Sequence, residues 1–162
     1  MDPIPVEALS GRSVETTIPH EIRGARSEDA EPLARLIGIL GYELSSGRIA
    51  DRLEAYNDNF SRVFVACQSA EPVGFLCFHG ITLFHEASTL GRITAMAIDP
   101  HHHRKGIGSC LVLAAENFAI SIGCSRMEVT SGDRREHDAH LFYRAQGYDS
   151  DCRRFLKHFS NP

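Results

Sequence analysis

One stretch of the chain, residues 93–122, constrains the fold more than any other. Apolar and small residues from Ile93 to Ile98 are typical of a strand, and Asp99 and Pro100 end that run. A basic turn containing glycines follows, and apolar residues then recur at helical spacing. The predicted buried stripe of this helix comprises Ile107, Leu111, Ala114, Ala115, Phe118 and Ile122. Gly123 stands where helices often end in the left-handed conformation, so the sequence predicts a strand, a basic turn and a helix.

The turn from His103 to Gly108 has the composition of an anion-binding site. Free N–H groups and the positive end of the dipole at a helix start attract anions, and glycines let a ligand approach the backbone. Arg104 and Lys105 add positive charge, so we expect a bound phosphate or pyrophosphate, with a plain connection as the open alternative. A Walker loop does not fit because Lys105 precedes the glycines. The dinucleotide fingerprint does not fit because Leu111 stands in place of its third glycine.

The order of a strand, a turn of the form (R/Q)-x-x-G-x-G/A and a long helix resembles motif A of the GNAT superfamily of N-acetyltransferases. The resemblance implies that backbone amides of the turn bind the pyrophosphate of the cosubstrate acetyl-coenzyme A (acetyl-CoA). The chain departs from the family pattern at the first position, where His103 replaces the usual Arg or Gln and Arg104 follows. The coenzyme contacts implied by position are Met96, Ala97, Ile98, His103, Arg104, Lys105, Gly106, Ile107, Gly108, Ser109 and Tyr143.

A second block matches the family's motif B pattern A-x-x-F-Y-x-x-x-G-F/Y, with Ala139, Phe142, Tyr143, Gly147 and Tyr148 at its defined positions. On spacing alone, a tyrosine on a core-facing helix is most often a packed aromatic whose hydroxyl finds one partner. The resemblance implies a second role for Tyr143, close to the coenzyme sulfur. There it would act as the general acid toward the leaving thiolate.

The two motifs together imply transfer of an acetyl group from acetyl-CoA to an amine. No nucleophile is marked in the sequence, so the amine is expected to attack the thioester directly in a ternary complex. An amine with a pKa of about 10 is only about one part in a thousand deprotonated at pH 7, so a base or a pKa-lowering pocket is needed. Glu128 is the first choice for the base, with His79, His85, Asp138 or a water chain as alternatives. By resemblance, the developing oxyanion binds a backbone N–H near Ala97.

Outside these motifs, strand and helix patterns predict a single domain. Residues 1–19 are expected to form a mobile N-terminal arm, and residues 20–162 a single GNAT acetyltransferase domain. Strands are predicted at residues 20–25, 62–67, 73–81, 90–98, 126–131 and 152–159, with a further short strand near Tyr148. Helices are predicted at residues 27–40, 47–56, 107–122 and 136–146. This order predicts an α/β fold, and the resemblance implies the GNAT fold, a mixed, mostly antiparallel sheet of six to seven strands with helices on both faces.

The composition narrows the classes of function. A length of 162 residues fits one domain, and the net charge of −4 argues against a nucleic-acid partner. Without a membrane-spanning apolar run or a signal-peptide pattern, we expect a cytoplasmic protein with no membrane partner. The five cysteines form no C-x-x-C pair and suit reduced thiols. No metal is expected, because the consecutive side chains of His101, His102 and His103 cannot easily converge on one ion.

Within the family, the resemblance extends to the aminoalkylphosphonate and related small-amine acetyltransferases. It is carried by the run from Phe78 to His85 and by the block from His137 to Tyr143. It implies a small-molecule amine as acceptor, and Arg92 or Arg135 could supply positive charge for an anionic one. A protein or peptide N-acetyltransferase and a non-catalytic acyl-CoA-binding domain remain as alternatives. The apolar residues of the last predicted strand suggest a homodimer, and they are Phe155, Leu156 and Phe159.

Overall fold

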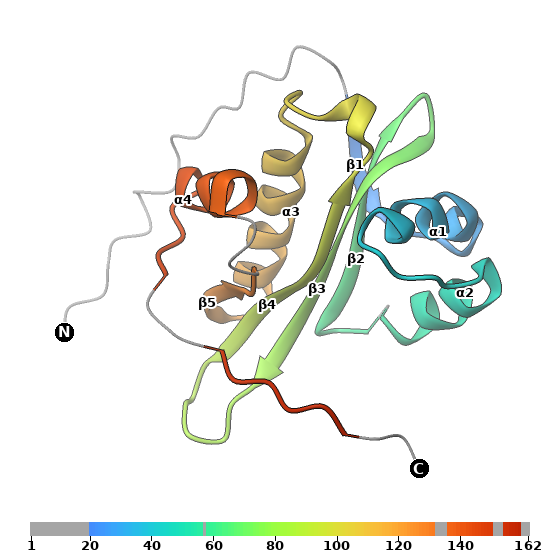
Figure 1. The fold of residues 1–162 in the computed structure, drawn as a ribbon. Helices are drawn as coiled ribbons and strands as arrows, with labels where there is room; N and C mark the ends of the chain where they lie inside the picture. The colour runs from blue at the N-terminus through green and yellow to red at the C-terminus, as the bar shows by residue number, and fades with distance from the viewer. Residues whose placement is uncertain (1–19, 57, 132–135, 151–153, 160–162) are drawn as a thin grey trace.

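Figure 1 shows a computed structural model of the chain, which describes residues 20–56, 58–131, 136–150 and 154–159. A central sheet separates two pairs of helices, with α1 and α2 on one face and α3 and α4 on the other. The expected arm at residues 1–19 lies outside the described residues, as do Arg135 and Cys152. Within the described part of the chain, no helix is long and apolar enough to cross a membrane.

The described sheet has five strands in the order β1-β2-β3-β4-β5. Antiparallel pairing joins β1 (Glu21–Gly24), β2 (Ser61–Gln68), β3 (Glu71–Thr82) and β4 (Thr89–Ile98) in sequence. β5 (Cys124–Val129) is parallel to β4, which requires the crossover through α3. The predicted mixed, mostly antiparallel sheet with helices on both faces is therefore confirmed.

The prediction of six to seven strands is wrong, because the described residues form five. Residues 154–159, the described part of the predicted last strand, adopt no regular structure, and Tyr148 lies in a loop after α4. Phe155 is 88% exposed and Phe159 is 84% exposed, so this segment does not bury its apolar side chains against the described core. A β-rich composition produces a strand only where a neighbouring strand satisfies its backbone groups.

The described residues form four α-helices that cover the sheet: α1 (Ala30–Ile39), α2 (Ser46–Ala55), α3 (Ile107–Ser121) and α4 (Leu141–Ala145). The helix predicted at residues 136–146 has two parts, because a π-helical turn (Glu136–His140) precedes α4. α2 begins where the Ser45 hydroxyl accepts a hydrogen bond from the Arg48 N–H, which satisfies one of the free amides of its first turn.

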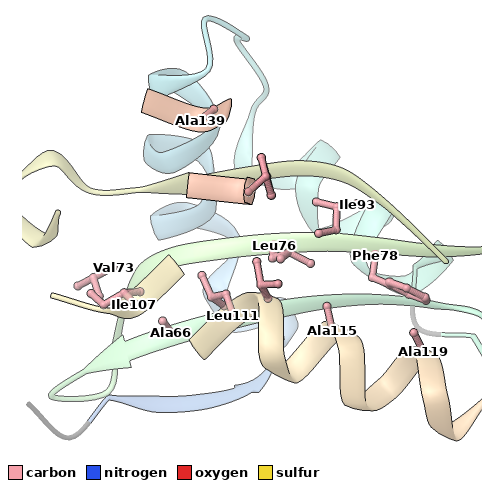
Figure 2. Close-up of a cluster of buried hydrophobic side chains, with 12 residues drawn as sticks. Ala66, Val73, Leu76, Phe78, Ile93, Ile107, Leu111, Ala115, Ala119 and Ala139 are labelled. Atoms are coloured by element: carbon pink, nitrogen blue, oxygen red, sulfur yellow. The ribbon is translucent and has the colours of Figure 1, made fainter. Parts of the chain in front are cut away.

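The core consists of two clusters, one on each face of the sheet. On the α3 face, Leu111, Ala115 and Ala119 pack onto side chains of the strands, among them Leu76 and Phe78 (Figure 2). The cluster on the other face joins α1 and α2 to the sheet and comprises Ala30, Leu33, Leu36, Ile49, Leu53, Val63, Val65, Cys67, Phe75 and Ala97. Full burial of one such aliphatic or aromatic side chain contributes about 1.5–3 kcal/mol, so each cluster fixes its helices firmly to the sheet.

Candidate active site

β4 loses one of its two neighbours halfway along its length. Its pairing with β3 continues to Ile98, whereas its pairing with β5 ends at Ile93, which lies opposite Val129. Residues 94–98 therefore have a described strand on the β3 side only, and we call their other side the free edge of β4. Unpaired backbone N–H and C=O groups on such an edge can bind an extended ligand.

A β-bulge at Thr94 coincides with the end of the β4–β5 pairing. Ile93 lies opposite Phe78 and Ala95 lies opposite Cys77, so Thr94 is the additional residue on β4. The Thr94 hydroxyl donates a hydrogen bond to the Cys77 carbonyl at 3.4 Å. Because a bulge bends and twists its strand, it accounts for the separation of β4 from β5 beyond this point.

The direction of the backbone groups along the free edge follows from two contacts. The Asp99 N–H bonds to a carbonyl of β3 at 2.8 Å. The Ile98 carbonyl instead accepts a hydrogen bond from His103 Nε2 at 2.9 Å, in the basic turn (residues 103–108). Alternate residues of a strand direct their backbone groups to the same side. The N–H and C=O of Ala97 therefore face β3, and those of Met96 and Ile98 face the free edge.

The basic turn contains two residues in the left-handed region. Arg104 has a φ of 59° and Gly106 has a φ of 76°. Glycine adopts this conformation without strain, whereas a residue with a side chain is held there at a cost of about 1–3 kcal/mol, which is typical of ligand sites. The Lys105 ammonium donates to the His101 carbonyl at 3.0 Å and braces the turn.

α3 begins without a side-chain cap, because its N-cap residue is Gly106. The Cys110 N–H bonds to the Gly106 carbonyl at 3.1 Å and closes the first turn. The amides before it point out of the helix end, where the helix dipole favours an anion. The exposed side chains of Arg104 and Lys105 flank this end. The turn therefore has the donors and the charge that a phosphate or pyrophosphate requires.

Gly108 has a packing role that the sequence did not suggest. A Cβ at this position would lie 3.1 Å from the Phe142 ring and 3.2 Å from Ile98 Cδ1, so the glycine lets α3 approach α4 and β4 closely. Gln146 Nε2 donates to the Ser109 hydroxyl at 3.0 Å and fixes the end of α4 against the first turn of α3. The predicted coenzyme contacts of Gly108 and Ser109 stay predictions.

Tyr143 lies in α4, next to the start of α3. Its side chain is 9% exposed, and its ring meets the rings of Phe142 and Tyr148 edge-on at 5.1 and 5.7 Å. Burial, together with the charge of Glu116, raises the pKa of Tyr148 above its usual range. The Tyr148 hydroxyl donates to Met127 Sδ at 3.9 Å. Tyr143 is thus held in an aromatic cluster between the basic turn and β5.

Glu128, the first-choice base, lies on β5 directly opposite Arg92 of β4. Glu128 Oε2 lies 3.1 Å from Arg92 Nη2, and Glu128 Oε1 lies 3.6 Å from Arg126 Nε. The Arg126 guanidinium also binds Glu86, with Nη2 donating at 3.0 Å. Glu128 is therefore positioned between two guanidinium groups, and Arg92, the cation expected for an anionic acceptor, is already paired.

His79 belongs to the same face of the sheet. Its Nδ1 lies 2.5 Å from the Ser61 hydroxyl, and the Asp58 carboxylate lies 3.5 Å from that hydroxyl. The His79 ring is 6.2 Å from the ring of Tyr56, at the end of α2. Directly paired positions on β2, β3, β4 and β5 form a polar row, which comprises Ser61, His79, Arg92 and Glu128.

The two other base candidates are engaged elsewhere. His85 Nε2 lies 3.5 Å from Glu86 in the exposed loop between β3 and β4. The Asp138 carboxylate accepts a hydrogen bond from the Ala139 N–H in the π-helical turn. Across the described ranges of the chain, no group of three or more His, Cys, Asp or Glu side chains is placed to hold a metal ion.

A pocket of about 540 Å³ lies between the helix pair α1–α2 and the sheet, and we call it the α1–α2 pocket. Its walls include Thr94 and Ala95, so it reaches the bulge of β4. The complete lining comprises Leu33, Ile37, Leu40, Tyr42, Glu43, Leu44, Ile49, Arg52, Leu53, Tyr56, Val63, Phe75, Cys77, Thr94 and Ala95. Sequence reasoning missed this pocket, because segments far apart in the chain contribute its walls and no local pattern marks them.

Residues 30–148 match the family described as the Acetyltransferase (GNAT) family. The chain belongs to this family. GNAT enzymes are acyltransferases that use acetyl-CoA, so the predicted class of enzyme and its cosubstrate are confirmed at the level of the family.

Individual GNAT relatives support the same assignment. The chain is 30% identical over 146 residues to an aminoalkylphosphonate N-acetyltransferase from Salmonella typhimurium (strain LT2), covering 85% of this chain and 90% of that protein. Its fold is similar to that of glucosamine-6-phosphate N-acetyltransferase from Arabidopsis thaliana (TM-score 0.77, 17% identity, 88% and 99% coverage). It is also similar to an aminoglycoside N-acetyltransferase in complex with CoA (TM-score 0.76, 14% identity, 91% and 99% coverage).

Proposed function

We propose that the protein transfers an acetyl group from acetyl-CoA to a primary amine of a small molecule. The observation that carries this proposal is the juxtaposition of three features at one point of β4. The free edge begins at Thr94, the basic turn follows the same strand, and the α1–α2 pocket reaches the bulge from the opposite face. A coenzyme along the free edge and an amine in the pocket would therefore meet at the bulge.

The residues of the basic turn suit the pyrophosphate of acetyl-CoA. The left-handed conformations of Arg104 and Gly106 expose backbone to a ligand, and the uncapped start of α3 offers further N–H donors. Met96 and Ile98 direct backbone groups to the free edge, where an amide-containing coenzyme arm can pair as a strand would. These residues position the acyl donor, which supplies the acetyl group for the reaction.

Direct attack by the amine, without an acyl-enzyme, agrees with the chemistry of the pocket. Cys77 is the cysteine in its wall, and burial raises the pKa of its thiol to about 12. A thiol with so high a pKa stays protonated at neutral pH and is a poor nucleophile. The amine itself is therefore the group that attacks the thioester carbonyl.

A backbone N–H is the proposed donor to the charge that develops on the thioester oxygen. Ala97 was the expected donor, but its backbone groups face β3. The N–H groups of Met96 and Ile98 face the free edge and can reach a ligand there. We therefore assign the donor to one of these two neighbours of Ala97. Tyr143, held beside the start of α3, is the proposed acid for the leaving thiolate.

For the base, the contacts favour His79 over Glu128. The Glu128 carboxylate is shared between Arg92 and Arg126. His79 is oriented through Nδ1 by Ser61, and it lies beside Tyr56, a wall residue of the α1–α2 pocket. This arrangement leaves Nε2 of His79 as the proton acceptor, directly or through one water. Glu128 would then neutralise the charge of Arg92 and would not take a proton from the amine.

The proposal is tested by measuring thiol release from acetyl-CoA with a panel of small amines, amino acids and peptides. Tyr143→Phe is expected to lower kcat by about 100-fold while acetyl-CoA binding is unchanged, because it removes only the acid. Tyr148→Phe, which alters the neighbouring half-buried tyrosine, is the matched control and should change kcat little. Acetyl-CoA binding without turnover on any amine would support a non-catalytic binding domain. Turnover of peptides alone would support a protein acetyltransferase.

A further inference from the structure

We propose that the acceptor is a primary amine carrying an apolar alkyl or aryl group, which occupies the α1–α2 pocket. This inference rests on the proposed function, because it names the class of amine for the same site. It separates this chain from its aminoalkylphosphonate-acetylating relative, whose substrate name implies an acceptor that carries a phosphonate.

The interior of the α1–α2 pocket is apolar. Leu33 and Phe75 are fully buried in its walls, and Ile49 and Leu53 extend the same surface from α2. Further aliphatic contacts come from Ile37, Leu40, Leu44, Val63 and Ala95. Such walls stabilise an alkyl chain or a ring, and they provide no hydrogen bonds for a charged group. Two tyrosines, Tyr42 and Tyr56, add aromatic surface that favours a ring.

The charged groups of the pocket do not favour an anion. Glu43 and Arg52 line it with opposite charges, and neither forms an ion pair with another described residue. A phosphonate would thus meet one guanidinium accompanied by a carboxylate. Arg92, the other cation considered for this purpose, is bound to Glu128 at 3.1 Å. A multiply charged anion needs several donors in a desolvated site, and the described pocket does not supply them.

The position of the bulge determines which end of the substrate faces the acyl donor. Thr94 and Ala95 form the wall nearest the free edge of β4, where the acyl donor is proposed to lie. The amino group must therefore be at this end. The apolar part then extends between α1 and α2, and Cys77 beside the bulge presents a neutral thiol that does not compete for the acetyl group.

The experiment compares kcat/KM for ethylamine, butylamine, hexylamine and 2-phenylethylamine with that for 2-aminoethylphosphonate, using the full chain and acetyl-CoA. Each added methylene is expected to raise kcat/KM about fourfold until the pocket is filled, because burial of a methylene transfers apolar surface out of water. 2-Phenylethylamine should exceed 2-aminoethylphosphonate by at least about 100-fold, because burying an anion without paired cations is far more costly than burying a methylene.

Two variants make the interpretation specific. Leu44→Asp places a carboxylate in the pocket wall and should lower kcat/KM for hexylamine at least about tenfold, with acetyl-CoA affinity unchanged. Arg48→Gln, at an exposed arginine of α2 outside the pocket lining, is the control and should leave hexylamine turnover within about twofold.

The outcomes distinguish a wrong class of acceptor from a wrong enzymatic function. Faster turnover of 2-aminoethylphosphonate, lost in Arg52→Gln and retained in Arg48→Gln, would overturn the apolar-amine assignment and leave the acetyltransferase function intact. A flat response to chain length would also overturn the assignment. Acetyl-CoA binding with no turnover of any amine would overturn the proposed function itself.

Discussion

At the scale of single residues, His79 and Glu128 differ in how their side chains are engaged. Ser61 orients His79, whereas Arg92 and Arg126 hold Glu128. His79→Gln is expected to lower kcat/KM by about 100-fold, because it removes the proposed proton acceptor. Glu128→Gln should lower kcat/KM much less, because its carboxylate is held by two guanidinium groups and does not take the proton.

These two variants are compared by steady-state kinetics with one amine and saturating acetyl-CoA. A large loss of kcat/KM in Glu128→Gln with nearly full activity in His79→Gln would reverse the assignment. Nearly full activity in both variants would indicate a water chain without a dedicated side-chain base.

The backbone donor is also a single residue, and three proline substitutions identify it. Met96→Pro removes an N–H that faces the free edge, where proline is tolerated in strands. Ala97→Pro removes an N–H that faces β3. We expect Met96→Pro to fold and to lose about 100-fold in kcat, if Met96 and not Ile98 is the donor. Ile98→Pro distinguishes the two positions, and Ala97→Pro should mainly lower the thermal unfolding temperature. Full activity in both Met96→Pro and Ile98→Pro would exclude a donor on this edge.

At the scale of elements, the basic turn depends on the left-handed conformation at Gly106. Gly106→Ala should weaken acetyl-CoA binding by about tenfold, because a side chain at this φ costs about 1–2 kcal/mol and crowds the ligand. Gly38→Ala is the matched control, since a Cβ at this helical position meets no atom within 4 Å and should stabilise α1 slightly. Isothermal titration with acetyl-CoA measures both, and equal affinities in the two variants would contradict a coenzyme site at the turn.

The start of α1 depends on a buried ion pair. Asp29 accepts hydrogen bonds from the Arg23 guanidinium at 2.7 and 2.8 Å and from the Arg26 N–H at 2.7 Å. Burial alone would raise the pKa of Asp29, but these donors outweigh it and lower the pKa below its usual value. A carboxylate with a lowered pKa stabilises the fold above the unfolded pKa of about 3.9 and loses this contribution as pH falls through the folded pKa.

Asp29→Asn should therefore reduce the free energy of unfolding by about 3 kcal/mol at neutral pH. The difference from the wild type should shrink progressively below about pH 4. Chemical denaturation at several pH values measures this, with Asp51→Asn, an exposed position in α2, as the control. A difference independent of pH would show that the charge of Asp29 is unimportant.

The elements differ in how far the sequence predicted them. The strand, turn and helix at residues 93–122 were predicted because hydrophobic period and turn chemistry coincide there. The last strand was predicted wrongly, because the local composition around Phe155 and Leu156 says nothing about whether a partner strand is available. The α1–α2 pocket and the pairing of Arg92 with Glu128 depend on strand register and on helices distant in sequence, which periodicity does not reveal.

At the scale of the whole molecule, the sheet lies between the proposed coenzyme site and the proposed acceptor pocket. The α3 and α4 face contributes the basic turn and Tyr143, and the α1 and α2 face contributes the α1–α2 pocket. The coenzyme and the amine are proposed to meet at the bulge and the free edge of β4. The exposure of Phe155, Leu156 and Phe159 is compatible with the expected homodimer, which stays a prediction.

In the proposed complex, the coenzyme lies along the free edge of β4 and ends in the basic turn. A crystal structure of the protein with acetyl-CoA tests it most directly. The pyrophosphate should lie against the backbone of residues 104–108, with the coenzyme arm paired with Met96 and Ile98. The thioester should lie close to Tyr143 and the mouth of the α1–α2 pocket. Acetyl-CoA bound away from β4, or a free edge covered by another part of the chain, would contradict it.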